Sequence, residues 1–72
     1  MEAAIMKILN DNAYADPFSE EAVISGVFDS LGFCNAIWEI EHELSREFPD
    51  EDVKLLWHGT VGDLVDYAKR KA

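Results

Sequence analysis

The sequence has few basic residues and only one cysteine, Cys34. A single cysteine cannot form an internal disulfide, and no group of cysteines and histidines has the spacing of a metal site, so helix packing has to provide the stability. A lone cysteine without a disulfide framework is typical of a reducing compartment, which makes the cytoplasm the expected location. The sequence also lacks an apolar run long enough to cross a bilayer, so no membrane insertion is expected.

The shortage of basic residues leaves a strongly acidic chain. Six lysines and arginines stand against fifteen aspartates and glutamates, which gives a formal net charge of −9. Such a surface repels the phosphates of nucleic acids and of anionic lipids, so neither is expected as a partner. A macromolecular partner would be a protein with a basic patch. Acidity that serves only solubility is the plainer alternative.

The chain has 72 residues, 49% of them hydrophobic, which predicts one globular domain and a free-standing monomer. Hydrophobic periodicity predicts helices over residues 2–10, 30–47 and 50–57, and a last helix that follows a cap at Thr60. The connection over residues 11–29 is long, but it has apolar residues that we expect to lie on the core: Phe18, Val23, Ile24, Val27 and Phe28. The expected fold is all-α, a small four-helix bundle with three main helices, a short third helix and a long first loop.

The second predicted helix, over residues 30–47, has an apolar and an acidic stripe. The inward stripe is expected to consist of six apolar residues: Leu31, Phe33, Ile37, Ile40, Leu44 and Phe48. Cys34 is expected to be a small buried hydrophobe, and Trp38 and Trp57 to pack in the core or at its rim. The acidic stripe is formed by Glu39, Glu43 and Glu47 at i, i+4 and i+8, with Glu41 enlarging it.

Ser30 stands in the first turn of this helix, where a serine can be a helix cap, a nucleophile or the acceptor of a covalent group. A cap is the commonest role, and either Asp29 or Ser30 is a suitable residue type. The nucleophile role lacks support, because Phe28 replaces the glycine that a nucleophile elbow has two residues before the serine. His42 lies several turns away on the same helix, and His58 lies in a connection, so no triad can be recognised.

The acceptor role has a physical argument of its own. A phosphodiester on Ser30 would lie beside free N–H groups at the positive end of the helix, which favours an anion. The group would also be exposed and preceded by a flexible loop, so that a modifying enzyme could reach it.

Residues 26–32 read Gly-Val-Phe-Asp-Ser-Leu-Gly and are followed by an amphipathic helix that ends in Ile-Glu-His-Glu-Leu. This region resembles the phosphopantetheine attachment region of acyl, peptidyl and aminoacyl carrier proteins, whose core motif, Asp-Ser-Leu or Asp-Ser-Met, matches residues 29–31. Within the family, the motif is most similar to those of D-alanyl carriers and stand-alone peptidyl-type carriers. The resemblance covers about residues 18–70 and includes acidic helix positions at Glu39 and Glu41, Pro49 after the helix, and Trp57 and Thr60 before the last helix.

The resemblance implies that Ser30 receives 4′-phosphopantetheine from coenzyme A through a separate phosphopantetheinyl transferase, with Asp29 and Leu31 completing the attachment site. The thiol of the cofactor would hold an acyl or aminoacyl group as a thioester, so the protein would be a carrier and not an enzyme. Its partners would be a ligase that loads the acyl or aminoacyl group and a downstream transferase or synthase. These partners would dock beside the apolar Leu31 on the acidic residues of the second helix: Glu39, Glu41, Glu43 and Glu47.

Two residues depart from the pattern of fatty-acid carriers, because Gly32 replaces the usual acid and Asn35 is neutral where many have glutamate. Together with the short first helix, they favour a small cargo, such as an amino acid or a short acyl group, or one left outside the bundle. Two other functions remain open. One is a small acidic interaction module that docks through the second helix without a prosthetic group, and the other is a hydrolase built on Ser30.

Overall fold

The structure is a computed structural model that describes residues 2–15 and 21–71. These residues form five helices and, within the described ranges, no β-strand: α1 (Glu2–Asn12), α2 (Ile24–Val27), α3 (Ser30–Leu44), α4 (Asp50–Trp57) and α5 (Val61–Lys71). The prediction of a small all-helical bundle is thus confirmed. Phe18, which we predicted to lie on the core, falls outside the described residues. Among the described helices, none has the length and apolar character needed to span a bilayer.

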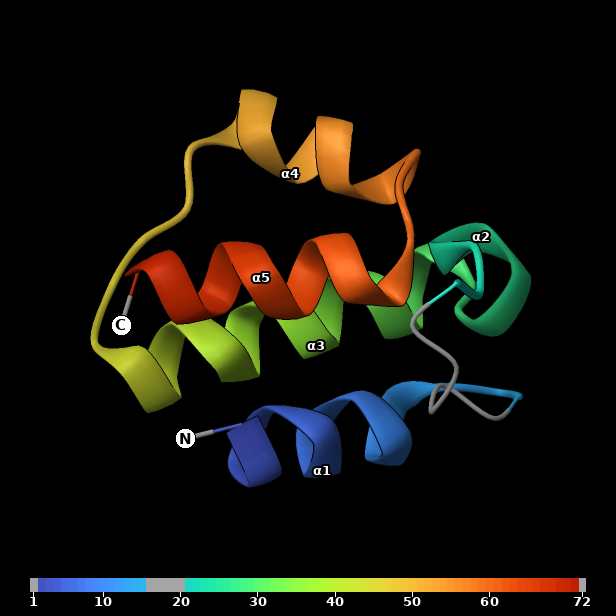
Figure 1. The fold of residues 1–72 in the computed structure, drawn as a ribbon, viewed down its shortest axis with the longest axis horizontal. Helices are drawn as coiled ribbons and strands as arrows, with labels where there is room; N and C mark the ends of the chain where they lie inside the picture. Colours follow the sequence, from blue (N-terminus) through green and yellow to red (C-terminus); the bar gives the residue numbers. More distant parts are fainter. Residues whose placement is uncertain (1, 16–20, 72) are drawn as a thin grey trace.

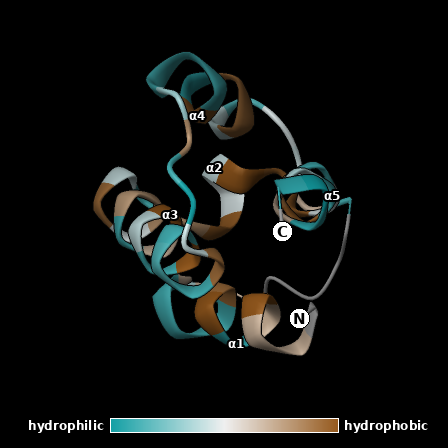
Figure 2. Ribbon diagram, turned by 90° about the vertical axis from the view of Figure 1, so that its left-hand side faces the viewer, coloured by the Kyte–Doolittle hydropathy of each residue, from teal (hydrophilic) through white to brown (hydrophobic). Residues whose placement is uncertain are grey.

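The helices enclose one hydrophobic interior. α3 and α5 extend along the long direction of the molecule on opposite sides of this interior, and α1 packs against both (Figures 1 and 2). α4 lies on the side opposite α1, and α2 lies at the end of the bundle where α3 begins (Figure 1). Every helix contributes buried side chains: Ile5 and Leu9 from α1, Ile24 and Val27 from α2, Phe33, Ala36, Ile37 and Ile40 from α3, Leu56 from α4, and Val61, Leu64, Val65, Tyr67 and Ala68 from α5.

The inward stripe of α3 agrees with the prediction except at its first residue. The confirmed members are Phe33, Ile37, Ile40 and Phe48, which are buried, and Leu44, which is half-buried and packs against the core. Leu31 is 70% exposed, so its place in the inward stripe was wrong. At 3.6 residues per turn it lies roughly 160° around the helix from Phe33. The predicted burial of Cys34 is also wrong, because this residue is exposed, and Trp38 is 60% exposed and lies outside the core.

α3 ends at Leu44 and not at residue 47, as we had predicted. Ser45 adopts the left-handed conformation, with φ 54° and ψ 43°, and its N–H donates to the carbonyl of His42. The N–H of Arg46 donates to the carbonyl of Glu41 at 3.0 Å, which completes a Schellman motif and stops the helix. Glu47 therefore lies in the loop after α3, and the predicted helical stripe of acids is interrupted before it.

Two side-chain contacts extend α1 to Asn12, two residues past its predicted end. Lys7 Nζ pairs with Asp11 Oδ2 at 3.0 Å, and Asn12 Nδ2 donates to the carbonyl of Ile8 at 2.8 Å. Both contacts join residues four apart, the spacing that stabilises a helix. The hydrogen bond with Asp11 raises the pKa of Lys7 above its usual value.

The connection before α3 contains the short helix α2, which the sequence did not predict. The segment is tied to the start of α5 by two backbone hydrogen bonds, from Ile24 N–H to the Gly59 carbonyl at 3.0 Å and from Val61 N–H to the Ala22 carbonyl at 2.9 Å. Its residues Ile24, Val27 and Phe28 are buried, as we predicted for this connection. Val23 is 51% exposed, so its predicted place on the core was wrong. The chain that leads directly into α3 is therefore fixed on the bundle, and the flexible loop that we expected immediately before Ser30 is not found there.

α5 begins with a reciprocal capping box. Asp63 N–H donates to Thr60 Oγ1 at 3.2 Å, and Thr60 N–H donates to Asp63 Oδ2 at 3.0 Å, so the predicted cap is confirmed. Further along α5, Tyr67 donates its hydroxyl proton to Asp52 of α4 at 2.6 Å. Burial and this hydrogen bond raise the pKa of Tyr67 to about 12, so the hydroxyl stays protonated and able to donate well into the alkaline range.

Candidate functional site

The candidate site is the N-terminal end of α3, where Ser30 is the first helical residue and is exposed. Asp29 precedes it in an extended conformation, with φ −85° and ψ 173°, and is the N-cap. The Asp29 carboxylate accepts a hydrogen bond from Gly32 N–H at 2.6 Å, and its carbonyl accepts one from Phe33 N–H at 2.9 Å. Because Asp29 supplies the cap, Ser30 is not needed for that role.

The first turn of α3 has donors available for an anion. The N–H groups of Gly32 and Phe33 are paired with Asp29, whereas those of Ser30 and Leu31 have no acceptor among residues 2–15 and 21–71. These two groups lie at the positive end of the helix dipole, next to the Ser30 hydroxyl. A phosphodiester formed on that oxygen would find both donors within reach, so the residues present fit a phosphopantetheine arm.

Gly32 allows α1 to approach the first turn of α3 closely. A Cβ atom at this position would lie 2.6 Å from the carbonyl oxygen of Asn12 and 3.0 Å from Asp29 Oδ1. Any side chain would therefore force the end of α1 away from α3. This close approach gives a physical reason for the glycine at this position.

The chain before Ser30 is held by the segment that follows α1 as well as by the start of α5. Tyr14 N–H donates to the carbonyl of Val27 at 2.9 Å, and its hydroxyl donates to the carbonyl of Ser25 at 3.2 Å. With Phe28 only 1% exposed, the exposed pair Asp29 and Ser30 follows directly on a buried anchor. The exposed Ser30 is therefore attached to a segment that hydrogen bonds and burial hold in place.

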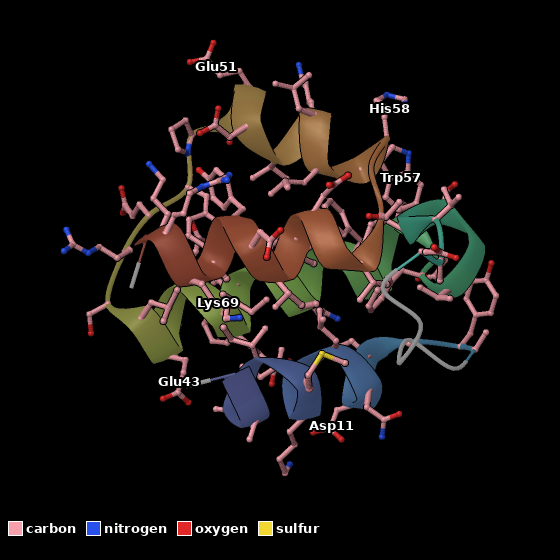
Figure 3. All side chains as sticks on the ribbon, in the orientation of Figure 1. Asp11, Glu43, Glu51, Trp57, His58 and Lys69 are labelled. Carbon is pink, nitrogen blue, oxygen red and sulfur yellow. The ribbon has the colours of Figure 1, made fainter. Side chains whose placement is uncertain are left out.

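The structure shows no base in contact with Ser30 within the described residues. His42 lies twelve residues further along α3, which is roughly 18 Å at the helical rise. His58 caps the C-terminal end of α4, and its ring points into solvent (Figure 3). No group of three or more potential metal ligands occurs in the part of the chain that the structure describes.

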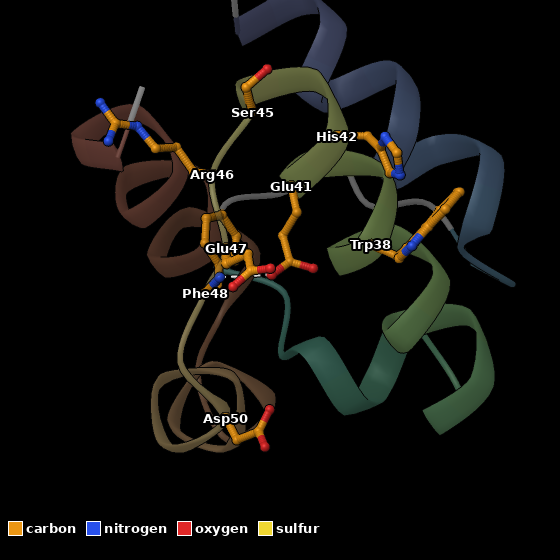
Figure 4. A pocket seen from close by; sticks show the side chains of 8 residues that line it. All are labelled: Trp38, Glu41, His42, Ser45, Arg46, Glu47, Phe48 and Asp50. Carbon is orange, nitrogen blue, oxygen red and sulfur yellow. Dashed lines mark hydrogen bonds between the residues drawn. The ribbon is translucent and has the colours of Figure 1, made fainter.

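The four predicted docking acids differ in their surroundings. Glu39 is half-buried and accepts a hydrogen bond from Asn12 Nδ2 at 2.5 Å, which joins α3 to α1. Glu41 is half-buried and accepts the N–H of Phe48 at 2.6 Å, which holds the loop after α3 in place (Figure 4). Glu43 and Glu47 are exposed, the first on α3 and the second in that loop. Two of the four acids therefore have structural partners.

An exposed ridge with two large apolar side chains follows the solvent face of α3, and only its first residue, Leu31, was part of the expected docking surface. We use the name outer ridge for Leu31, Asn35, Trp38 and His42, which are all exposed and are spaced at i, i+4, i+7 and i+11. Leu31 and Trp38 are two of the large exposed hydrophobic residues of the described chain, and the Trp38 and His42 rings are in edge contact at 4.2 Å. The seven-residue spacing of Leu31 and Trp38, out of phase with the inward stripe, was the signal in the sequence.

A shallow hollow of about 520 Å³ lies at the opposite end of α3 from Ser30 (Figure 4). Its lining is mostly polar and charged: Trp38, Glu41, His42, Ser45, Arg46, Glu47, Phe48 and Asp50. The nearest lining residue of α3, Trp38, is eight residues from Ser30, or roughly 12 Å along the helix. The hollow is therefore separate from the candidate site.

No protein-family model matches the chain, and no curated protein or solved structure matches it. The features of the chain that bear on its function are therefore the motif over residues 26–32 and the geometry of the first turn of α3.

Proposed function

We propose that the chain is a carrier protein with an acyl-carrier-like bundle. It holds an acyl or aminoacyl group as a thioester on a 4′-phosphopantetheine arm attached to Ser30, and it presents this group to partner enzymes without being a catalyst itself. The observation that carries the proposal is the division of roles at the start of α3. Asp29 caps the helix, and Ser30 next to it has an exposed hydroxyl beside two open N–H groups.

The residues of the chain position and stabilise the attachment point. The Ser30 hydroxyl is the oxygen that would replace the nucleotide part of coenzyme A on phosphorus, in a reaction catalysed by a separate transferase. The N–H groups of Ser30 and Leu31 favour the phosphodiester that results. When bound, the cofactor supplies a flexible thiol that holds the cargo in an activated form. We also propose, from the sequence alone, that the protein is located in the cytoplasm and is a monomer.

The partners in this proposal are the phosphopantetheinyl transferase, a ligase that loads acyl or aminoacyl groups, and a downstream transferase or synthase. We place their common contact on the outer ridge, which starts at Leu31 beside the attachment point. Glu43 adds a negative charge beside the outer ridge. A partner enzyme that fits this surface would therefore have an apolar recess with a basic rim. Such charge pairs accelerate encounter more than they increase affinity, which suits a protein that must leave each partner.

A second function is favoured by the same ridge. An acidic interaction module without any prosthetic group would also dock through Leu31 and Trp38, and it would leave Ser30 unmodified. A hydrolase has less support, because no base contacts Ser30 among the described residues.

Mass spectrometry separates these functions. The purified protein is incubated with coenzyme A and a broad-specificity phosphopantetheinyl transferase, and its mass is then measured. We expect one phosphopantetheine group per chain, no addition to Ser30→Ala, and full addition to the control Ser25→Ala, which removes another exposed serine.

The other outcomes identify the alternatives. An unmodified wild-type protein that still binds a partner through Trp38 contradicts the carrier proposal and supports the interaction module. Esterase activity that requires Ser30 and no coenzyme A supports the hydrolase. Modification that persists in Ser30→Ala places the arm on another residue and contradicts the proposed site.

A further inference from the structure

Three aromatic side chains fill the interior next to the candidate attachment point. Phe28 and Phe33 flank Ser30 in sequence and are 1% and 3% exposed. Their ring centroids are 6.5 Å apart in an edge contact, and Phe33 lies 5.2 Å from the ring of Trp57 at the end of α4. We call Phe28, Phe33 and Trp57 the aromatic plug.

The aromatic plug occupies the interior next to the start of α3, where Ser30 lies. Phe33 belongs to α3 and Trp57 to α4, so their ring contact joins these two helices near the start of α3. Trp57, at the end of α4, is half-buried and packs against the core (Figure 3). An alkyl chain that entered here would have to displace closely packed rings.

The hollows on the flank of α3 offer no apolar substitute, because Ile8 and Trp38 are their only large apolar lining residues, among polar and charged ones: Asn12, Asn35, Glu39, His42 and Glu43. Two further hollows are no better. The one at the C-terminal end of α3 has a mostly charged lining, as described above. Another, of about 320 Å³, lies between α4 and α5 and is lined by Asp52, Asp63, Asp66 and Arg70 together with Leu55, Leu56 and Tyr67. Neither would stabilise a long hydrocarbon, whose burial requires an apolar environment.

We propose that the cargo of this carrier stays outside the bundle, and that the protein is suited to a short or polar acyl group of the aminoacyl class, not to a long alkyl chain. This inference rests on the proposed function. A long alkyl thioester would remain in water, where its apolar surface favours aggregation and binding to other proteins. A short group that bears an amine loses little in water, so an exposed position is suitable for it.

Chemical loading tests the aromatic plug without any transferase. Ser30→Cys in a Cys34→Ser background has one thiol, at the attachment position, which reacts with methyl or octyl methanethiosulfonate. We expect the two products to have the same melting temperature within about 1 °C, because the octyl chain finds no site to occupy. An octyl product that melts about 4 °C or more above the methyl product would overturn the inference.

Removal of the plug is expected to reverse this result. In Trp57→Ala on the same background, the octyl product should melt several degrees above the methyl product, because the chain fills the space that the ring leaves. The control Trp38→Ala removes an exposed tryptophan and should show no dependence on chain length. Phe33→Leu replaces Trp57→Ala if the latter does not fold. Absence of a chain-length effect in every folded plug variant would contradict the assignment of the plug.

A final measurement distinguishes failure of this inference from failure of the proposed function. Wild-type protein is loaded at Ser30 from acetyl- or octanoyl-coenzyme A, and cleavage of the two thioesters by hydroxylamine is followed by mass spectrometry. Similar cleavage rates support an exposed cargo, and octanoyl cleavage that is about tenfold slower or more contradicts it while leaving the carrier function intact. If no arm is transferred to Ser30, the carrier function and the cargo inference both fail.

Discussion

The two ends of α3 differ in how they satisfy their backbone groups. At the N-terminal end, Asp29 and Gly32 form the cap and the close contact with α1, and Ser30 between them is left exposed. At the C-terminal end, a left-handed Ser45 and the carboxylate of Glu41 hold the loop. At the first end the Ser30 side chain has no structural partner among the described residues, whereas at the second end the charged side chain of Glu41 stabilises the loop. We therefore propose the functional contacts of α3 at its beginning and on its outer ridge.

Among the variants that test the two ends of α3, Gly32→Ala is expected to change the free energy of unfolding the most. The new Cβ would lie 2.6 Å from the carbonyl oxygen of Asn12, so α1 and α3 must separate, at a cost of about 1–3 kcal/mol in the free energy of unfolding. Urea denaturation measures the change. The control is Gly26→Ala, which has no atom within 4 Å of the new Cβ and should not destabilise the protein. Equal losses in the two variants would show that the close approach does not determine the packing.

The close contact of Gly32 with α1 could not be predicted from the sequence. The helices, the cap at Thr60 and most of the inward stripe follow from local spacing, which is why they could be predicted. The contact of Gly32 with Asn12 depends on how two distant helices meet, and the left-handed conformation occurs at Ser45, where glycine would be the usual signal. The boundary of α3 and the role of Glu41 could not be foreseen for this reason.

The candidate site was predictable in part. The motif identified Ser30, but the residue pattern alone allowed either Asp29 or Ser30 to be the cap. The orientation of the Asp29 carboxylate towards Gly32 resolves this choice. The outer ridge was foreseen only at Leu31, which the resemblance placed beside the docking partners but the hydrophobic spacing counted with the inward stripe. Trp38 was expected in the core or at its rim, although its angular position is close to that of Leu31 and differs from that of Phe33.

A second test compares the neighbours Asp29 and Ser30. Asp29→Ala should cost about 1 kcal/mol in the free energy of unfolding, because Gly32 N–H loses its acceptor. Ser30→Ala should change stability by less than about 0.5 kcal/mol and abolish modification. Thermal melting and mass spectrometry of both variants give the two readouts. A loss at Ser30 as large as that at Asp29 would return the serine to a structural role.

A third test separates the acids along α3. Glu41→Ala should destabilise the protein by about 1 kcal/mol, because the Phe48 N–H would lose a charged acceptor, and Glu43→Ala should have almost no effect on stability. Conversely, Glu43→Lys should slow modification by a transferase with a basic rim, most strongly at low salt. Salt-independent rates for Glu43→Lys would exclude this residue from the docking surface.

The smallest effect concerns the other end of the helix, at Ser45. This residue has φ 54°, a conformation that costs an L-amino acid more than it costs glycine, so Ser45→Gly should stabilise the protein by about 0.5–1 kcal/mol. Ser25→Gly, within the helix α2, should have the opposite sign because glycine weakens a helix interior. Urea denaturation of the two variants measures both signs. Because Ser45 lies at the structural end of α3, Ser45→Gly should leave the rate of modification at Ser30 unchanged, and a changed rate would mean that the two ends of the helix are coupled.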